Sequence, residues 1–157
     1  MNKIKLFCDG SVNPQKKTGF AAYFIYDKNL TCQNINLKKF ENTSSTKLEL
    51  EALLWALEDE TLKNKQITVY TDCQNILGLF NRKEKLEKNS YLTSTGKTVK
   101  NHELYKEFFT QCDKLDICFE KVEGHKKSSL KNEIDNLFNL VDKASRKALR
   151  EYLIPKY

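Results

Sequence analysis

The sequence predicts an α/β fold in which helices flank a mixed five-stranded sheet, in the order βββαβαβα. The first part of the chain holds apolar segments separated by turn residues, which indicates hairpin-linked strands. Further along, apolar strands alternate with segments of helical periodicity, which indicates helices packed on the sheet. Two strands run into an aspartate, Asp9 and Asp72, where an acidic side chain is hard to explain structurally.

Three strands are expected first, over Lys3–Cys8, Gly19–Tyr26 and Leu30–Phe40. Turn residues around Asn13-Pro14 separate the first two strands, and Asp27-Lys28-Asn29 separates the second from the third. Because short turns join them in succession, these three strands are predicted to be antiparallel.

A helical pattern begins after these strands, over Thr46–Leu57. At about 100° per residue, one broad face carries the apolar residues Leu50, Leu53, Leu54, Ala56 and Leu57. Glu49 falls inside this apolar arc, whereas Glu51 points the other way and is expected to be solvated. A glutamate on a buried face needs a partner, so Glu49 is a candidate functional residue.

The rest of the chain supplies two strands and three helical segments. They are the strand Gln66–Asp72, a short helix at Gln74–Phe80, a polar Lys-rich stretch at Asn81–Lys100, a helix at His102–Cys112, the strand Asp116–Val122, and a closing helix at Leu130–Arg150. No internal repeat or low-complexity linker interrupts this order, so residues 1–157 are predicted to form one domain.

Asp9, Glu49 and Asp72 are expected to meet where adjacent strand ends lie beside a helix start. Carboxylates this close repel one another unless they are protonated or bridged by a cation. Hard divalent ions such as Mg²⁺ prefer oxygen ligands, and the sequence has no Cys/His cluster at the spacing typical of zinc. The pattern therefore indicates a metal-dependent enzyme that acts on phosphates.

Composition narrows the class of protein less sharply. A net charge of +6 is compatible with a polyanionic partner, although many soluble proteins carry this charge without binding nucleic acid. No apolar run approaches about 18 residues and no signal-peptide core is evident, so neither membrane insertion nor secretion is expected. The five cysteines form no CxxC pair, which favours a reduced, cytoplasmic setting.

Four motifs in order resemble the ribonuclease H family, type 1, over essentially the whole chain. They are Asp9-Gly10-Ser11 with Asn13-Pro14, Thr46-Lys47-Leu48-Glu49-Leu50-Glu51-Ala52, Tyr70-Thr71-Asp72-Cys73-Gln74, and Val122-Glu123-Gly124-His125. Serine is more usual than Cys73 in the third motif. The resemblance implies a ribonuclease H-like fold and hydrolysis of the RNA strand of RNA–DNA hybrids, leaving 5′-phosphate and 3′-hydroxyl ends.

The resemblance also implies a catalytic site. Asp9, Glu49 and Asp72 would bind two Mg²⁺ ions, which Mn²⁺ can replace, for in-line attack on the phosphodiester. His125, on a polar loop, would shuttle protons or help to release the product.

The family's fourth carboxylate has two candidates, Asp142 and Asp135. Asp135 has the usual separation from His125, whereas Asp142 lies in Leu140–Arg146, which looks like the family's final-helix signature. The two aspartates lie on the same helix face, about two turns apart. If the helix is straight, only one of them can therefore lie near the metal ions. Asp142 is favoured, with residues 128–139 as an insertion.

Substrate contacts are implied at two places. Asn13 and Gln74 match family positions that contact 2′-hydroxyls, and Ser45 stands where the family often has asparagine; turn and helix-start capping is the structural alternative. The family's basic protrusion matches residues 81–100, where phosphates would be bound by Lys83, Lys85 and Lys88. The alternative for that stretch is a solvated helix with Glu/Lys pairing.

Two other functions remain open at this point. One is a catalytically inactive hybrid-binding module, against which the retained carboxylates argue. The other is a different nuclease of the wider superfamily, against which His125 and the basic stretch argue. The expected partner is an RNA–DNA hybrid bound by a monomer, with a single-strand-binding protein as a further candidate and no membrane association.

Overall fold

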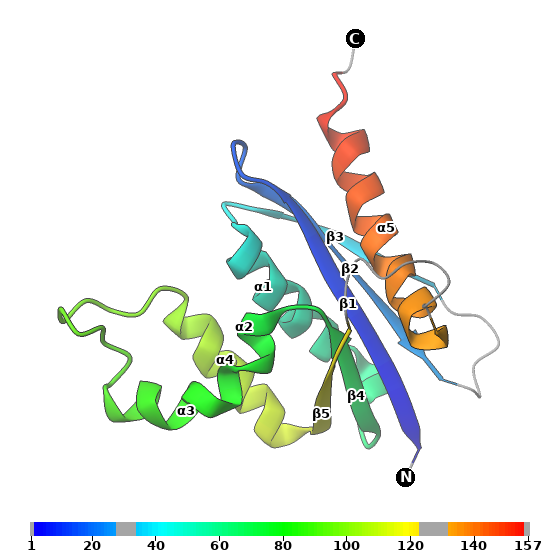
Figure 1. Ribbon diagram of the computed structural model, residues 1–157. Helices are drawn as coiled ribbons and strands as arrows, with labels where there is room; N and C mark the ends of the chain where they lie inside the picture. Colours follow the sequence, from blue (N-terminus) through cyan, green and yellow to red (C-terminus); the bar gives the residue numbers. More distant parts are fainter. Residues whose placement is uncertain (1, 28–33, 123–131, 156–157) are drawn as a thin grey trace.

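A computed structural model describes residues 2–27, 34–122 and 132–155 (Figure 1). The elements along the chain are β1 (Lys3–Asn13), β2 (Thr18–Tyr26), β3 (Asn36–Glu41), α1 (Ser45–Leu57), the 3-10 turn η1 (Glu60–Leu62), β4 (Gln66–Thr71), α2 (Gln74–Leu77), α3 (Leu79–Lys88), α4 (His102–Lys114), β5 (Asp116–Lys121) and α5 (Glu133–Leu153). The predicted α/β class is confirmed.

The five strands form one mixed sheet in the order β3-β2-β1-β4-β5. β1 pairs with β2 and β2 with β3 in antiparallel fashion, as predicted. β4 runs parallel to β1, and β5 runs parallel to β4. β1 is therefore the central strand of this sheet, with an antiparallel neighbour on one side and a parallel neighbour on the other.

Two strand boundaries differ from the prediction. β1 does not end at Cys8 but continues to Asn13, because antiparallel pairing with β2 persists as far as Asn13 opposite Thr18. Asp9 thus lies within a strand and not at its end. The described part of β3 begins at Asn36, and residues 30–33 of the expected strand fall outside the described residues.

The first part of the Lys-rich stretch forms a helix, which the sequence offered only as an alternative. The single short helix expected at Gln74–Phe80 is instead the one-turn α2, followed by α3. Leu79 and Leu86 lie about two turns apart on α3, and both are buried in the main core. These two anchors and the ring contact of Phe80 with Phe108 hold α3 against the domain, while most of its polar side chains are exposed.

Helices cover both faces of the sheet (Figure 1). α5 packs along one face against β1 and β2, and α1 packs on the opposite face with α4 beside it. Side chains alternate along β1 between the two cores: Leu6 and Cys8 enter the core under α1 and α4, and Phe7 enters the core under α5. Among the described residues, every helix is too short or too polar to cross a lipid bilayer.

The start of α1 lies unusually close to the sheet. A Cβ atom added at Gly10 would lie 2.9 Å from Leu48 Cδ2, and one added at Gly19 would lie 2.6 Å from the same atom. A larger residue at either position would displace Leu48, and one at Gly19 would also meet the backbone oxygen of Ser11 at 2.9 Å. This close approach brings the next residue, Glu49, to the part of the sheet where Asp9 lies.

Candidate active site

The strand register brings Asp9 and Asp72 together. β1 and β4 are parallel, with Phe7 opposite Tyr70, and the two rings stack at 5.0 Å between centroids. Asp9 and Asp72 each follow this pair by two residues, on adjacent strands that run in the same direction. Their side chains are close enough for the charge of Asp72 to raise the pKa of Asp9.

Helix α5 brings a further carboxylate to the same place. Asp9 shares a face of β1 with Phe7, the face on which α5 packs, and its carboxyl group hydrogen-bonds with Asp142. Two residues along the strand, Ser11 Oγ lies 3.1 Å from Ser145 Oγ, and Ser145 Oγ donates to the carbonyl oxygen of Asp142 at 3.1 Å. These contacts determine which residues of α5 lie opposite Asp9 and Ser11 of β1.

Asp135 has a different environment. Its backbone N–H donates to Asn132 Oδ1 at 3.0 Å, and its Oδ2 accepts from the backbone N–H of Asn132 at 3.0 Å. This reciprocal pair is a capping box that begins α5. The structure therefore brings Asp142 to Asp9, while Asp135 is used at the start of the helix. Asp142 Oδ1 also lies 3.1 Å from Arg146 Nε.

Glu49 reaches the site from α1 and is half-buried. Its Oε2 accepts a hydrogen bond from Cys73 Sγ at 2.7 Å. Burial raises the pKa of Glu49 and the charge of Asp72 adds to that rise, whereas the thiol hydrogen bond lowers it. Asp72 therefore acts electrostatically on both Asp9 and Glu49.

Glu51 is not the fully solvated residue that the helical pattern indicated. It is half-buried, and its Oε1 accepts from the hydroxyl of buried Thr43 at 2.5 Å. The hydrogen bond arises because the segment before α1 folds back over the first turns of the helix. The helical periodicity of α1 alone carries no information about that segment.

Burial and like charge combine most strongly at Asp9. Burial raises the pKa of Asp9 to about 8, with the charge of Asp72 and the hydrogen bond with Asp142 adding to the rise. The backbone N–H of Gly10 acts in the opposite direction. A carboxyl group with this pKa is partly protonated at neutral pH unless a positive charge is placed beside it.

The donor set suits a hard divalent cation, because it consists of carboxylate oxygens held against their mutual repulsion. Across residues 2–27, 34–122 and 132–155, no three acidic, histidine or cysteine side chains are already gathered closely enough to hold a metal ion. Attraction to a bound cation would offset the repulsion among these carboxylates.

The residues expected to contact the hybrid lie near this site but make local contacts of their own. Asn13 Oδ1 accepts from the backbone N–H groups of Gln15 and Lys16, both at 3.0 Å, so it caps the β1–β2 turn. Ser45 and Gln74 are exposed first residues of α1 and α2.

Ser45 lines a pocket between the β1–β2 turn, the start of α1 and the start of α4. Three lysines, Lys17, Lys47 and Lys100, line the same pocket, together with the side chains of Thr43, Ser44 and Asn101. Lys47 was not among the residues expected to contact substrate. Lys47 lies in the motif that contains Glu49. Its position there does not reveal that three lysines, far apart in the sequence, line one pocket.

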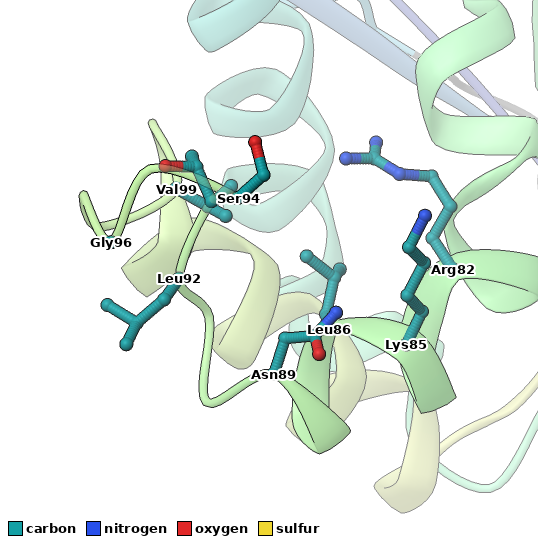
Figure 2. Close-up of a pocket in the computed structure, with 9 residues that line it drawn as sticks. Arg82, Lys85, Leu86, Asn89, Leu92, Ser94, Gly96 and Val99 are labelled. Carbon is teal, nitrogen blue, oxygen red and sulfur yellow. The ribbon is translucent and has the colours of Figure 1, made fainter.

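The basic protrusion forms a second pocket, between α3 and the loop that follows (Figure 2). Arg82 and Lys85 extend from α3 on the side that faces Ser94 of the loop, and Leu86 and Val99 also line the pocket.

Lys83 and Lys88 do not line this pocket. Lys83 turns toward α4, where its Nζ is 4.0 Å from Asp113 Oδ1 and 5.4 Å from the centre of the Phe109 ring. Lys88 is exposed at the end of α3.

The family model described as RNase H matches residues 1–148. The chain belongs to the ribonuclease H family. A protein named Ribonuclease H from Caldicellulosiruptor saccharolyticus is 34% identical over 159 residues, with 96% of this chain and 99% of that protein covered. The sequence resemblance to this family is thereby confirmed.

Solved structures of ribonuclease H domains share the fold. The PFV RNase H domain has a TM-score of 0.72 at 15% identity, with 94% of each chain covered. The foamy viral protease-reverse transcriptase in complex with dsDNA has a TM-score of 0.65 at 14% identity, with 92% of this chain and 93% of that chain covered.

Membership of the ribonuclease H family makes the protein an enzyme of that class. His125, the expected catalytic histidine, lies in residues 123–131, outside the described residues. Its role stays a prediction.

The raised pKa of Asp9 predicts how stability depends on pH. With a folded pKa of about 8 against an ordinary 3.8, native Asp9 keeps a proton that the unfolded chain releases. Its contribution to stability is complete below about pH 4 and is lost as the pH rises through about 8. The variant Asp9→Asn avoids this loss, so its advantage in unfolding free energy over the wild type should grow by up to about 1 kcal/mol per pH unit.

Urea denaturation in the presence of a chelator, at pH 5 and pH 8, measures this difference. Glu84→Gln is the matched control, because Glu84 is exposed on α3 and should give a small difference that does not change with pH. An Asp9→Asn advantage that stays constant over this range would contradict the raised pKa.

Proposed function

We propose that the protein hydrolyses the RNA strand of RNA–DNA hybrids by two-metal-ion catalysis, at a site formed by Asp9, Glu49, Asp72 and Asp142. The products would carry 5′-phosphate and 3′-hydroxyl ends. The observation that carries this proposal is the electrostatic coupling of Asp9 with Asp72 and Asp142, and of Glu49 with Asp72, in a chain of this family.

The chain's own residues would prepare the site for cations. The four carboxylates would hold two Mg²⁺ ions, or Mn²⁺ in their place, with Asp9 contributing to both. Bound cations would supply Lewis acidity, which activates water and stabilises the charge on the leaving oxygen. Arg146 Nε lies 3.1 Å from Asp142 Oδ1 and would restrict the orientation of that carboxylate.

His125 would move a proton to or from the reacting groups, or assist release of the product. A histidine with its ordinary pKa exchanges protons readily near neutral pH. This assignment rests on the family motif Val122-Glu123-Gly124-His125 in the sequence.

The pocket beside Ser45 would bind a backbone phosphate of the hybrid. Lys17, Lys47 and Lys100 supply positive charge there, and the first backbone N–H groups of α1 lie at the same edge. Asn13 and Gln74 would contact 2′-hydroxyls on the RNA strand. The side-chain oxygen Oδ1 of Asn13 already accepts two backbone N–H groups of the turn. The contact would therefore be made by its side-chain N–H₂ group.

The basic protrusion would bind phosphates farther along the duplex, through Lys85 and Lys88 with Arg82 beside them. Lys83 stays a predicted contact, although its ammonium lies near Asp113 in this structure. A structural neighbour solved in complex with dsDNA supports binding of a duplex by this fold.

A monomeric state, a single domain, a cytoplasmic location and recruitment by a single-strand-binding protein stay predictions.

The direct test is cleavage of labelled RNA–DNA hybrid, duplex RNA and duplex DNA in Mg²⁺. We expect cleavage of the RNA strand of the hybrid alone, lost in Asp9→Asn. Tight hybrid binding without cleavage in Mg²⁺ or Mn²⁺ would instead indicate a binding module. Cleavage of duplex DNA would indicate another nuclease of the superfamily.

A matched pair of variants tests the fourth carboxylate. Asp142→Ala should lower kcat/KM roughly tenfold or more, because it removes a charge from the metal site. Asp135→Ala should leave kcat/KM within about threefold, but should lower the unfolding free energy by about 1 kcal/mol through loss of the capping box. Steady-state kinetics and urea denaturation separate the two effects. The reverse pattern would assign the role to Asp135.

Lys85→Gln tests the protrusion. Its KM for hybrid at low salt should rise, and the slope of log KM against log salt should fall by about one, since one phosphate contact is lost. Lys63→Gln is the control, because Lys63 pairs with Glu60 on η1 at 2.8 Å. Equal KM values and equal salt slopes for the two variants would show that α3 is only a solvated helix.

A further inference from the structure

Cys73 lies at the site, but the proposed mechanism does not use it. It is the N-cap residue of α2 and is only 5% exposed. Its backbone N–H donates to Thr71 Oγ1 at 3.1 Å, which fixes the turn at the end of β4. Its Sγ then points at Glu49 Oε2, 2.7 Å away.

The thiol is a dependable hydrogen-bond donor in this setting. A cysteine thiol ordinarily keeps its proton at neutral pH, and this buried one lies within hydrogen-bond distance of Glu49 Oε2. The acceptor, Glu49, is half-buried and faces the negative charge of Asp72. A donor on Oε2 stabilises the ionised carboxylate against both influences.

The hydrogen bond also restricts the orientation of Glu49. Glutamate has three side-chain torsions, and repulsion from Asp72 would turn its carboxylate away from the other acids. With Oε2 held by a donor fixed at the start of α2, Oε1 is the oxygen left to face a cation.

We propose that Cys73 is a positioning residue, whose S–H group holds Glu49 Oε2 so that the carboxylate is oriented to bind a divalent cation. This inference rests on the proposed function of the same site. Serine, the more usual residue here in the family, carries a donor on a side chain of similar length. The hydrogen bond would therefore survive Cys73→Ser and be lost in Cys73→Ala.

Calorimetric titration of Mn²⁺ into the protein without substrate tests the proposal. Cys73→Ala should bind Mn²⁺ about tenfold more weakly than the wild type, the size expected for loss of a hydrogen bond to a charged group. Cys73→Ser should bind within about twofold of the wild type. Cys112→Ala is the control, because it removes another partly buried thiol from the same core and should not change the affinity.

Infrared spectroscopy gives an independent measurement that does not require Cys73→Ala to fold. The S–H stretching band that disappears in Cys73→Ser is assigned to Cys73, and it should shift in Glu49→Gln because the acceptor loses its charge. Glu51→Gln should leave the band unchanged, since Glu51 accepts from Thr43.

Different results overturn different claims. Mn²⁺ binding by Cys73→Ala equal to the wild type, or a Cys73 band insensitive to Glu49→Gln, would overturn the positioning role while wild-type hybrid cleavage stands. Failure of the wild type to cleave hybrid would overturn the proposed function, and the infrared band would still report on the hydrogen bond. Failure of the wild type to bind Mn²⁺ would overturn both.

Discussion

Alternation of side chains along β1 is the constraint on which both the cores and the site depend. Leu6 and Cys8 enter the core beneath α1 and α4, while Phe7 enters the core beneath α5. The same alternation turns Asp9 and Ser11 toward α5, where Asp142 and Ser145 meet them. A shift of one residue in the pairing of β1 would exchange the two faces and move Asp9 away from Asp142.

The sheet concentrates negative charge at one place, and packing is what holds it there. Parallel pairing of β1 with β4 sets Asp9 beside Asp72, and the small volume of Gly10 and Gly19 lets α1 carry Glu49 to the same edge. Each contact that brings an acid closer also raises the free energy of the ionised site, as the pKa of Asp9 shows. Gathering these carboxylates thus favours binding of a cation, but it lowers the stability of the protein when no cation is bound.

Two acids of the site, Asp142 and Glu49, have a polar neighbour that engages one carboxylate oxygen. Arg146 lies one helical turn beyond Asp142, and Cys73 reaches Glu49 from the start of α2. Neither neighbour supplies an oxygen ligand. Their effect is on orientation, because a carboxylate with one oxygen engaged has fewer ways to avoid its like-charged neighbours.

The sequence by itself determined the order of the five strands and the helices α1, α4 and α5, and it singled out Asp9, Glu49 and Asp72, because these signals lie in short stretches of chain. Only the tertiary structure decided between Asp142 and Asp135 as the neighbour of Asp9. Both lie on one helix, and the height at which α5 packs on β1 depends on contacts between distant residues such as Ser11 and Ser145. The same limit hid the full length of β1, which pairing with β2 sets, and the bond from Cys73 to Glu49. The local sequence pattern determines whether a segment forms a strand or a helix. The residues that a side chain contacts depend instead on packing between segments far apart in the sequence.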